Sequence, residues 1–323
     1  MKDSPPLPAP ITVRVPASTS NLGPGFDFLG LALDLPLDVT VLGTASEGQH
    51  EFVALDGAAA SWPIGVDNRM TRAIDHALRH AGHAPLALRM TVRSEIPTGR
   101  GFGSSGAATI AGLLLGHALA RSEPAIEEVV SQGALLEGHP DNSTASLLGG
   151  CTLAVPKPSG ETAPGEMAWR VIRQTIHPSI GFAIAWPERP LHTEEGRRAL
   201  PEHVSFVDAV ENPRRVAALL EGMRRGDPEL LTLGAEDRLH VNYRLPLIPG
   251  AAEALQAARQ GGAWLATISG SGSGLIALAA KTDCAAIASA MAEQLERAQG
   301  SATSRVVTPA LSAPRVEPGS QLP

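Results

Sequence analysis

The sequence contains few aromatic residues and only two cysteines. Aromatic side chains make up 3% of its 323 residues, so a core has to be built from alanine, leucine, valine and isoleucine. The cysteines, Cys151 and Cys284, make neither a disulfide framework nor a cluster of metal ligands. We therefore expect both to be small buried side chains.

Long apolar runs, basic runs and an apolar leader are also missing. No stretch is long and apolar enough to span a membrane. A net charge of −7 without a basic patch argues against a nucleic-acid partner. Residues 1–6 lack the apolar core of a signal peptide, so we expect a cytoplasmic protein that binds neither membrane nor nucleic acid. The length and the 43% hydrophobic content suit two globular domains.

Glycine is concentrated in one stretch, PTGRGFGSSGAA at residues 97–108. A tight glycine turn leads into two serines that open an apolar helix running to about residue 121. Glycine lets a backbone fold tightly and approach a ligand closely, and a helix N-terminus attracts anions. A helix cap without a ligand would need fewer glycines, so the stretch predicts a phosphate site.

Two other glycine-rich loops can be set aside. A Walker-type loop needs a lysine after its last glycine, and none is present. Gly101, Gly103 and Gly106 match the dinucleotide-binding pattern, which should directly follow a buried parallel strand. The preceding residues 86–93 instead alternate between apolar side chains and polar ones such as Arg89 and Arg93. This alternation is typical of a strand with one wet face.

The stretch resembles the phosphate loop of the GHMP kinases, with Phe102 where leucine is usual and Gly106 where alanine is frequent. The resemblance implies an ATP-dependent small-molecule kinase. Asn68 precedes a predicted helix over 70–81; its residue type favours a helix cap, whereas the resemblance favours a contact with the nucleotide base. The ATP contacts that the resemblance implies within the loop are Pro97, Gly99, Arg100, Gly101, Phe102, Gly103, Ser104, Ser105, Gly106 and Ala107.

A second polar stretch, residues 16–27, is predicted to be a loop between two strands. It carries Ser18, Asn21 and Asp27, which can all bind a ligand. The run PASTSNLGPGFDFLG at 16–30 resembles the N-terminal signature of the homoserine kinase branch of the GHMP family. This resemblance implies L-homoserine as the substrate, with Ser18 among its contacts and with Asp27 and Asn21 at its ammonium group.

A third polar cluster follows a predicted helix that starts after a Ser122 cap and ends at Glu137, where the sequence continues GHPDN. A glutamate at a helix end is usually solvated. Beside a phosphate loop, however, Glu137 becomes a candidate Mg²⁺ ligand together with Ser105. His139, without partners at ligand spacing, is expected to form hydrogen bonds rather than to bind metal.

The resemblance gives His139 and Asn142 to the substrate site. Asn142 stands where other GHMP branches carry a catalytic aspartate. The resemblance therefore implies that no side chain acts as general base, that Asn142 orients the reacting hydroxyl, and that the proton passes directly to the γ-phosphate.

The second half of the chain supplies two arginines and a third glycine loop. The planar guanidinium suits a carboxylate, and the resemblance implies that Arg197 and Arg244 hold the substrate carboxylate, with Arg198 as an uninvolved neighbour. The loop SGSGSG at 269–274 resembles the third GHMP motif, with Ser273 in place of the usual proline. The motif implies that Gly270 lies beside the substrate.

Composition places a linker at 156–165, between an N-terminal domain over 10–156 and a C-terminal domain over 166–310, with loose tails at 1–9 and 311–323. The second half shows a β-β-α…β-β-α-β order that begins with strands at 169–174 and 180–186. The resulting fold class is α+β, with an N-terminal α/β domain that carries the phosphate loop and a C-terminal ferredoxin-like α+β sandwich. A homodimer remains open.

Two alternative functions also remain open. One is another GHMP small-molecule kinase of the mevalonate or diphosphocytidyl-methylerythritol type, whose substrates lack the ammonium group that Asp27 and Asn21 would bind. The other is a non-catalytic ligand sensor on the same fold. Such a sensor should have lost its metal-binding residues, but Ser105 and Glu137 are both present.

Overall fold

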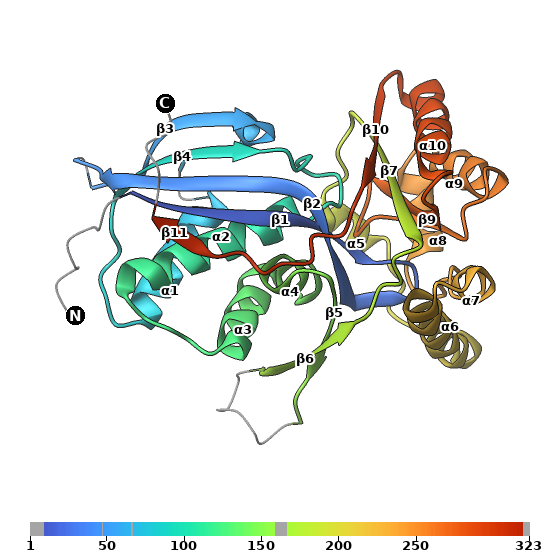
Figure 1. Ribbon diagram of the computed structural model, residues 1–323, viewed down its shortest axis with the longest axis horizontal. Coiled ribbons are helices and arrows are strands. Elements are labelled where there is room, and N and C mark those ends of the chain that lie inside the picture. The colour runs from blue at the N-terminus through green and yellow to red at the C-terminus, as the bar shows by residue number, and fades with distance from the viewer. Residues whose placement is uncertain (1–9, 47, 66, 159–166, 319–323) are drawn as a thin grey trace.

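The computed structural model describes residues 10–46, 48–65, 67–158 and 167–318. Most of the first half forms a seven-stranded sheet (Figure 1), whose path runs β11–β1–β2–β4–β3, with β5 paired to β2 and β6 to β5. The strands are β1 (Ile11–Asn21), β2 (Gly25–Thr44), β3 (Glu51–Gly57), β4 (Leu88–Ser94), β5 (Cys151–Pro156), β6 (Trp169–Gln174) and β11 (Val316–Pro318).

Four helices cover one face of this sheet (Figure 1). They are α1 (Arg69–His80), α2 (Ser104–Ala120), α3 (Ile126–Glu137) and α4 (Asp141–Leu148), and a 3-10 turn, η1 (Ala58–Ser61), follows β3. The central helix, α2, contacts α1, α3, α4 and β1. It is apolar on nearly all sides because it is enclosed by them. The alternation predicted before the phosphate loop is confirmed, since Leu88, Met90 and Val92 in β4 are buried while Arg89 and Arg93 are exposed.

The second half forms a four-stranded antiparallel sheet in the order β10–β7–β9–β8. Its strands are β7 (Ile180–Pro187), β8 (Leu265–Ile268), β9 (Leu275–Ala280) and β10 (Ala302–Val307). Helix α9 (Ala251–Gln260) precedes β8, and α10 (Cys284–Gln299) connects β9 to β10. This is the predicted ferredoxin-like arrangement. The remaining elements are α5 (Thr193–Arg198), α6 (Phe206–Arg225), α7 (Pro228–Leu233), α8 (Val241–Arg244) and η2 (Leu245–Leu247).

The second sheet joins the two halves, because its strands β7, β8 and β9 are buried on both faces. Phe182 and Ile184 of β7 belong to the apolar core of the first half. Ala183 and Ala185, which alternate with them, pack with α9 and α10 in a second core. Because successive strand residues point to opposite faces, one strand contributes to both cores. Cys151 and Cys284 are buried and unpaired, as predicted.

The polar stretch at 16–27 is not the loop expected from its sequence. β1 continues to Asn21 and β2 begins at Gly25, so only a tight turn separates the two strands. Residues 18–20 are buried, because the second half of the chain covers this end of β1, where the backbone N–H of Gly270 donates to the carbonyl of Ser20. The polar pattern therefore marks an enclosed, hydrogen-bonded surface rather than a solvated turn.

Two segments near the ends of the predicted C-terminal domain also lie in a different sheet or element from the one expected. Trp169–Gln174 is a strand, as predicted, but it pairs with β5 in the first sheet rather than with the second sheet. Val316–Pro318, which falls in the expected tail, pairs with β1. Alternation identifies a strand but not its partner, so sequence alone could not assign either strand to a sheet. The domain bounds stay predictions, and residues 1–9 and most of the linker lie outside the described residues.

Two helix predictions were wrong in detail. Ser122 does not cap α3, which starts at Ile126 after Ala125; its hydroxyl instead lies 2.8 Å from Nδ1 of His117. The sequence also predicts a helical stretch near 228–240, but α7 ends at Leu233, and the short helix α8 follows at Val241–Arg244. Gly234 ends α7 in the structure, and its low helix propensity explains why the pattern breaks there.

Candidate active site

The three glycine-containing stretches converge, as expected if they form one site. The hydroxyl of Ser269 donates to the carbonyl of Gly101 at 2.7 Å, and the backbone N–H of Gly274 donates to the carbonyl of Arg100 at 3.0 Å. The side-chain amide of Asn21 donates to the carbonyl of Gly270 at 3.0 Å. Residues from β1, the phosphate loop and the 269–274 loop thus hold one another directly.

This packing explains two of the glycines. Gly101 has a φ of +75°, and a Cβ there would collide with the carbonyl oxygen of Ser269. Gly103 has a φ of +69°, and a Cβ there would collide with the hydroxyl of Ser18. The sequence predicted that glycine admits a ligand. The structure adds that it also admits the two neighbouring segments.

The phosphate loop faces a cavity of about 410 Å³, and α2 begins at its edge with Ser104. Arg100 does not point into this cavity. Its guanidinium donates to the carbonyls of Thr98, Pro187 and Glu188, so it fastens the loop to the end of β7. Of the loop residues expected to contact ATP, those that line the cavity are Gly99, Gly101, Phe102, Gly103, Ser104 and Ser105; Pro97, Arg100, Gly106 and Ala107 do not line it.

Asn68 caps α1, which was the prediction from its residue type. Its Oδ1 accepts from the backbone N–H of Thr71 at 3.1 Å, and its amide donates to the carbonyl of Pro63 at 2.7 Å. It also lines the cavity, so a contact with a nucleotide base stays a prediction. Two neighbours that the sequence argument did not identify, Trp62 and Arg69, also line the cavity.

Glu137 is nearly enclosed, with its side chain 2% exposed. Its Oε1 accepts from the hydroxyl of Thr109 at 2.6 Å and from Nη1 of Arg69 at 3.3 Å. Ser105 lines the cavity, whereas Glu137 stands behind its edge. The described residues hold no group of three or more His, Cys, Asp or Glu side chains that could bind a metal by themselves. One carboxylate and one hydroxyl nevertheless fit Mg²⁺, which completes its shell with phosphate oxygens and waters.

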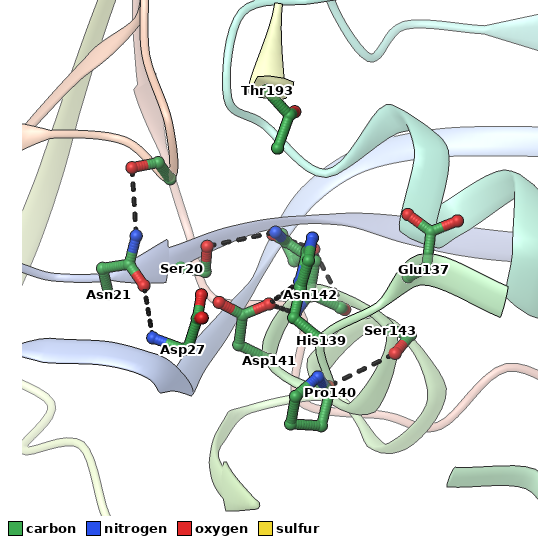
Figure 2. Close-up of polar contacts among 12 residues, drawn as sticks. Ser20, Asn21, Asp27, Glu137, His139, Pro140, Asp141, Asn142, Ser143 and Thr193 are labelled. Carbon is green, nitrogen blue, oxygen red and sulfur yellow. Dashed lines mark hydrogen bonds and ion pairs between the residues drawn. The ribbon is translucent and has the colours of Figure 1, made fainter. Parts of the chain in front are cut away.

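Asp27 and Arg197 form an ion pair on the other side of the cavity. Two guanidinium nitrogens of Arg197 donate to the two carboxylate oxygens, at 3.0 and 2.8 Å. The side chains are 35% and 37% exposed. The hydrogen bond to Asp27 raises the pKa of Arg197. Asn21 holds the backbone of Asp27 in place, because its Oδ1 accepts from the backbone N–H of Asp27 at 3.0 Å (Figure 2).

Arg244 lines the cavity but is only 2% exposed. It donates to the carbonyls of Gly196 and Gly270 at 3.1 and 3.3 Å, and Nη1 lies 3.1 Å from Nδ1 of His240. Burial lowers its pKa to about 10, and the nearby charge of Arg197 adds to this effect. Arg244 therefore keeps its charge at neutral pH. The buried His240, which sequence reasoning missed, reaches it from the preceding turn of the chain.

His139, Asp141 and Asn142 meet Ser20 at the centre of the site (Figure 2). Oδ1 of Asp141 lies 2.5 Å from Nδ1 of His139 and accepts from the backbone N–H of Asn142 at 2.7 Å. Burial alone would lower the pKa of His139, but the hydrogen bond and charge of Asp141 outweigh it and raise that pKa. Burial would raise the pKa of Asp141, and the contact with His139 lowers it instead.

Asn142 is held on both sides of its amide. Its Oδ1 accepts from the hydroxyl of Ser18 at 3.0 Å, and its Nδ2 donates to the hydroxyl of Ser20 at 3.0 Å. In the view of Figure 2, Asn142 lies between Asp27 and Glu137. Ser18 is fully buried and does not line the cavity. Its contacts with Asn142 and Ser146 favour positioning of Asn142 over a direct ligand contact.

Comparisons with known proteins agree with this architecture. Residues 68–150 match the family model for the GHMP kinases N terminal domain, and residues 219–297 match the model for GHMP kinases C terminal. A homoserine kinase from Synechococcus sp. (strain RCC307) is 39% identical over 289 residues, which cover 89% of this chain and 90% of the relative. One from Prochlorococcus marinus (strain MIT 9303) is 38% identical over 88% and 89% of the two chains.

Solved structures show the same fold. A homoserine kinase from Cytophaga hutchinsonii superposes with a TM-score of 0.78 at 23% identity, over 97% of this chain and 99% of the other. A putative homoserine kinase from Listeria monocytogenes gives 0.71 at 27% identity, over 95% and 99%. No helix among the described residues has both the length and the apolar character needed to cross a lipid bilayer. With its two family domains, its phosphate loop and these relatives, the chain belongs to the GHMP kinase family.

Proposed function

We propose that this protein is a homoserine kinase, which transfers the γ-phosphoryl group of ATP to the side-chain hydroxyl of L-homoserine. The observation that carries this proposal is the Asp27–Arg197 pair in the same cavity as the phosphate loop. An α-amino acid carries an ammonium and a carboxylate one carbon apart. A facing carboxylate and guanidinium can each bind one of these groups. The names of the relatives at 38–39% identity support the same substrate.

ATP would bind with its phosphates at the start of α2. The backbone N–H groups of the first helical turn and the hydroxyls of Ser104 and Ser105 are free to face an anion there. Ser105 and Glu137 would hold Mg²⁺ together with the phosphates. The ion would supply charge neutralisation for the transferred group. The adenine base would lie toward Trp62 and Asn68, which also line the cavity and precede the phosphate loop in the sequence.

Homoserine would break the ion pair between Asp27 and Arg197 and form one ion pair with each of these two side chains. Its ammonium would bind Asp27 and its carboxylate Arg197, with Arg244 adding positive potential from beneath. Asn142, fixed by Ser18 and Ser20, would orient the hydroxyl. Nδ1 of His139 is occupied by its contact with Asp141, and we assign His139 no role as a proton acceptor. The hydroxyl proton would then pass directly to a γ-phosphate oxygen. The loose transition state of phosphoryl transfer makes positioning and charge neutralisation the main requirements.

A coupled assay of ADP release tests this function. L-homoserine, L-serine, L-threonine, mevalonate and a diphosphocytidyl-methylerythritol substrate should be compared at equal concentration with ATP and Mg²⁺. We expect L-homoserine to give the highest kcat/KM and mevalonate to give none. Comparable turnover of mevalonate would contradict the proposal, and release of ADP with none of them would favour a ligand sensor. A homodimer stays open, and the cytoplasmic location and the lack of a nucleic-acid partner remain predictions.

A further inference from the structure

Arg69 is a cation at the phosphate side of the cavity that the proposed mechanism does not use. It is the first residue of α1, directly after the Asn68 cap. Its side chain is 53% exposed and lines the same cavity as Ser104 and Ser105. Its contact with Oε1 of Glu137, at 3.3 Å, is that of a partly exposed ion pair. The guanidinium end of this pair is open to solvent, whereas the carboxylate end is enclosed.

The other arginines around the cavity are already occupied. Arg197 is bound by both oxygens of Asp27, and Arg244 donates to two buried backbone carbonyls. Arg100, although part of the phosphate loop, donates to backbone carbonyls away from the cavity. The loop itself offers a phosphate only backbone N–H groups and hydroxyls. Transfer of a phosphoryl group, however, requires strong neutralisation of its negative charge.

We propose that Arg69 binds the terminal phosphates of ATP and that its contact with Glu137 is the position it takes without nucleotide. The proposal rests on the proposed function, because it needs ATP at the phosphate loop and a metal at Glu137. A divalent cation on Glu137 would repel a guanidinium that shares the same carboxylate oxygen. A phosphate beside α1 offers that guanidinium a better acceptor, since arginine and phosphate form paired, charge-assisted hydrogen bonds.

Under this assignment, Arg69 competes with the metal for the Glu137 carboxylate when no nucleotide is bound. When ATP is bound, Arg69 contacts its phosphates instead. A purely structural role would instead make Arg69 the residue that holds Glu137 ready for the metal. The two roles predict opposite changes in metal binding when the charge of Arg69 is removed. They can therefore be separated without measuring turnover.

Binding of the non-hydrolysable analogue β,γ-imido-ATP should be measured by calorimetry for the wild-type protein, Arg69→Gln, Arg69→Lys and Arg72→Gln. Arg72 is an exposed arginine of the same helix and serves as the control. We expect Arg69→Gln to weaken binding at least tenfold, Arg69→Lys to restore part of the affinity, and Arg72→Gln to change nothing. Without the analogue, the Mg²⁺ concentration that half-saturates the site should be equal or lower in Arg69→Gln.

An unchanged affinity of Arg69→Gln for the analogue would overturn the proposal. A several-fold rise in the Mg²⁺ concentration that half-saturates the site in Arg69→Gln would also overturn it, because it would show that Arg69 only positions Glu137. A failure of the proposed function would look different: the wild-type protein would not phosphorylate L-homoserine, whatever the variants do. Matched thermal unfolding of all four proteins shows whether the variants retain the fold.

Discussion

At the scale of single residues, the site is built from charges that already have partners. Asp27 and Arg197 hold each other, and His139 and Asp141 do the same. A zwitterionic substrate can therefore bind by exchanging one ion pair for two. This exchange leaves no charge unpaired in either state.

Arg197→Leu tests the exchange. The variant loses a charge-assisted hydrogen bond to the substrate carboxylate, which is worth about 1.5–3 kcal/mol. We expect KM for L-homoserine to rise about tenfold or more, with little change in KM for ATP. Arg198→Leu is the control, because Arg198 is exposed and, among the described residues, pairs only with Glu194 on its own helix. Equal effects of Arg197→Leu on both KM values would show that Arg197 has a structural role.

The His139–Asp141 pair predicts a pH dependence of stability. The pKa of His139 is raised above 6.5, so its contribution is complete below 6.5 and disappears as pH rises through the raised value. The pKa of Asp141 is lowered below 3.8, so its contribution is complete above 3.8 and disappears as pH falls through the lowered value. The pair therefore stabilises the fold most between 3.8 and 6.5.

His139→Asn should accordingly melt well below the wild-type protein at about pH 5.5 and approach it at about pH 9. A gap in Tm that grows with pH would contradict this assignment. The same variant bears on the mechanism. A lost general base would reduce kcat about 10²–10⁴-fold, and we expect a much smaller loss at saturating substrates.

At the scale of elements, the phosphate loop depends on the loop at 269–274 as much as on α2. Gly101→Ala would place a methyl group against the carbonyl of Ser269 and force a positive φ on alanine. We expect a loss of unfolding free energy of at least about 1–3 kcal/mol, together with weaker binding of ATP. Gly43→Ala in β2 is the control, because a Cβ at that position meets no neighbour within 4 Å. Denaturant unfolding of both variants would measure the difference.

Local sequence patterns predicted the strand and the helix that flank the phosphate loop. They could not predict which sheet receives β6 or β11, because strand pairing is a tertiary choice. They also predicted a loop over 16–27 where the strands continue to Asn21 and restart at Gly25, since polarity alone does not distinguish a loop from a strand in a buried hydrogen-bond network. Arg69 and Trp62 lie outside the recognised motifs, and only the folded cavity brings them to the phosphate loop.

At the scale of the whole molecule, one face of β7 packs in each of the two apolar cores. We therefore expect the two halves to unfold together. Phe182→Ala removes a buried ring from the core of the first half, and we expect a loss of about 3–5 kcal/mol within a single calorimetric transition. Phe206→Ala removes a ring that is 83% exposed and should leave Tm nearly unchanged. Two separate transitions, of which Phe182→Ala lowers only one, would show that the halves are independent.

The pairing of β11 with β1 has a consequence for synthesis on the ribosome. β1 is among the earliest described residues to emerge, and β11 contains the last of them, yet the two lie side by side in one sheet (Figure 1). The edge of β1 that faces β11 therefore stays unpaired while the whole second sheet is translated. An unpaired strand edge is a site of unwanted association. The nascent chain thus carries an unpaired strand edge at Ile11–Val13 until Val316–Pro318 have been translated.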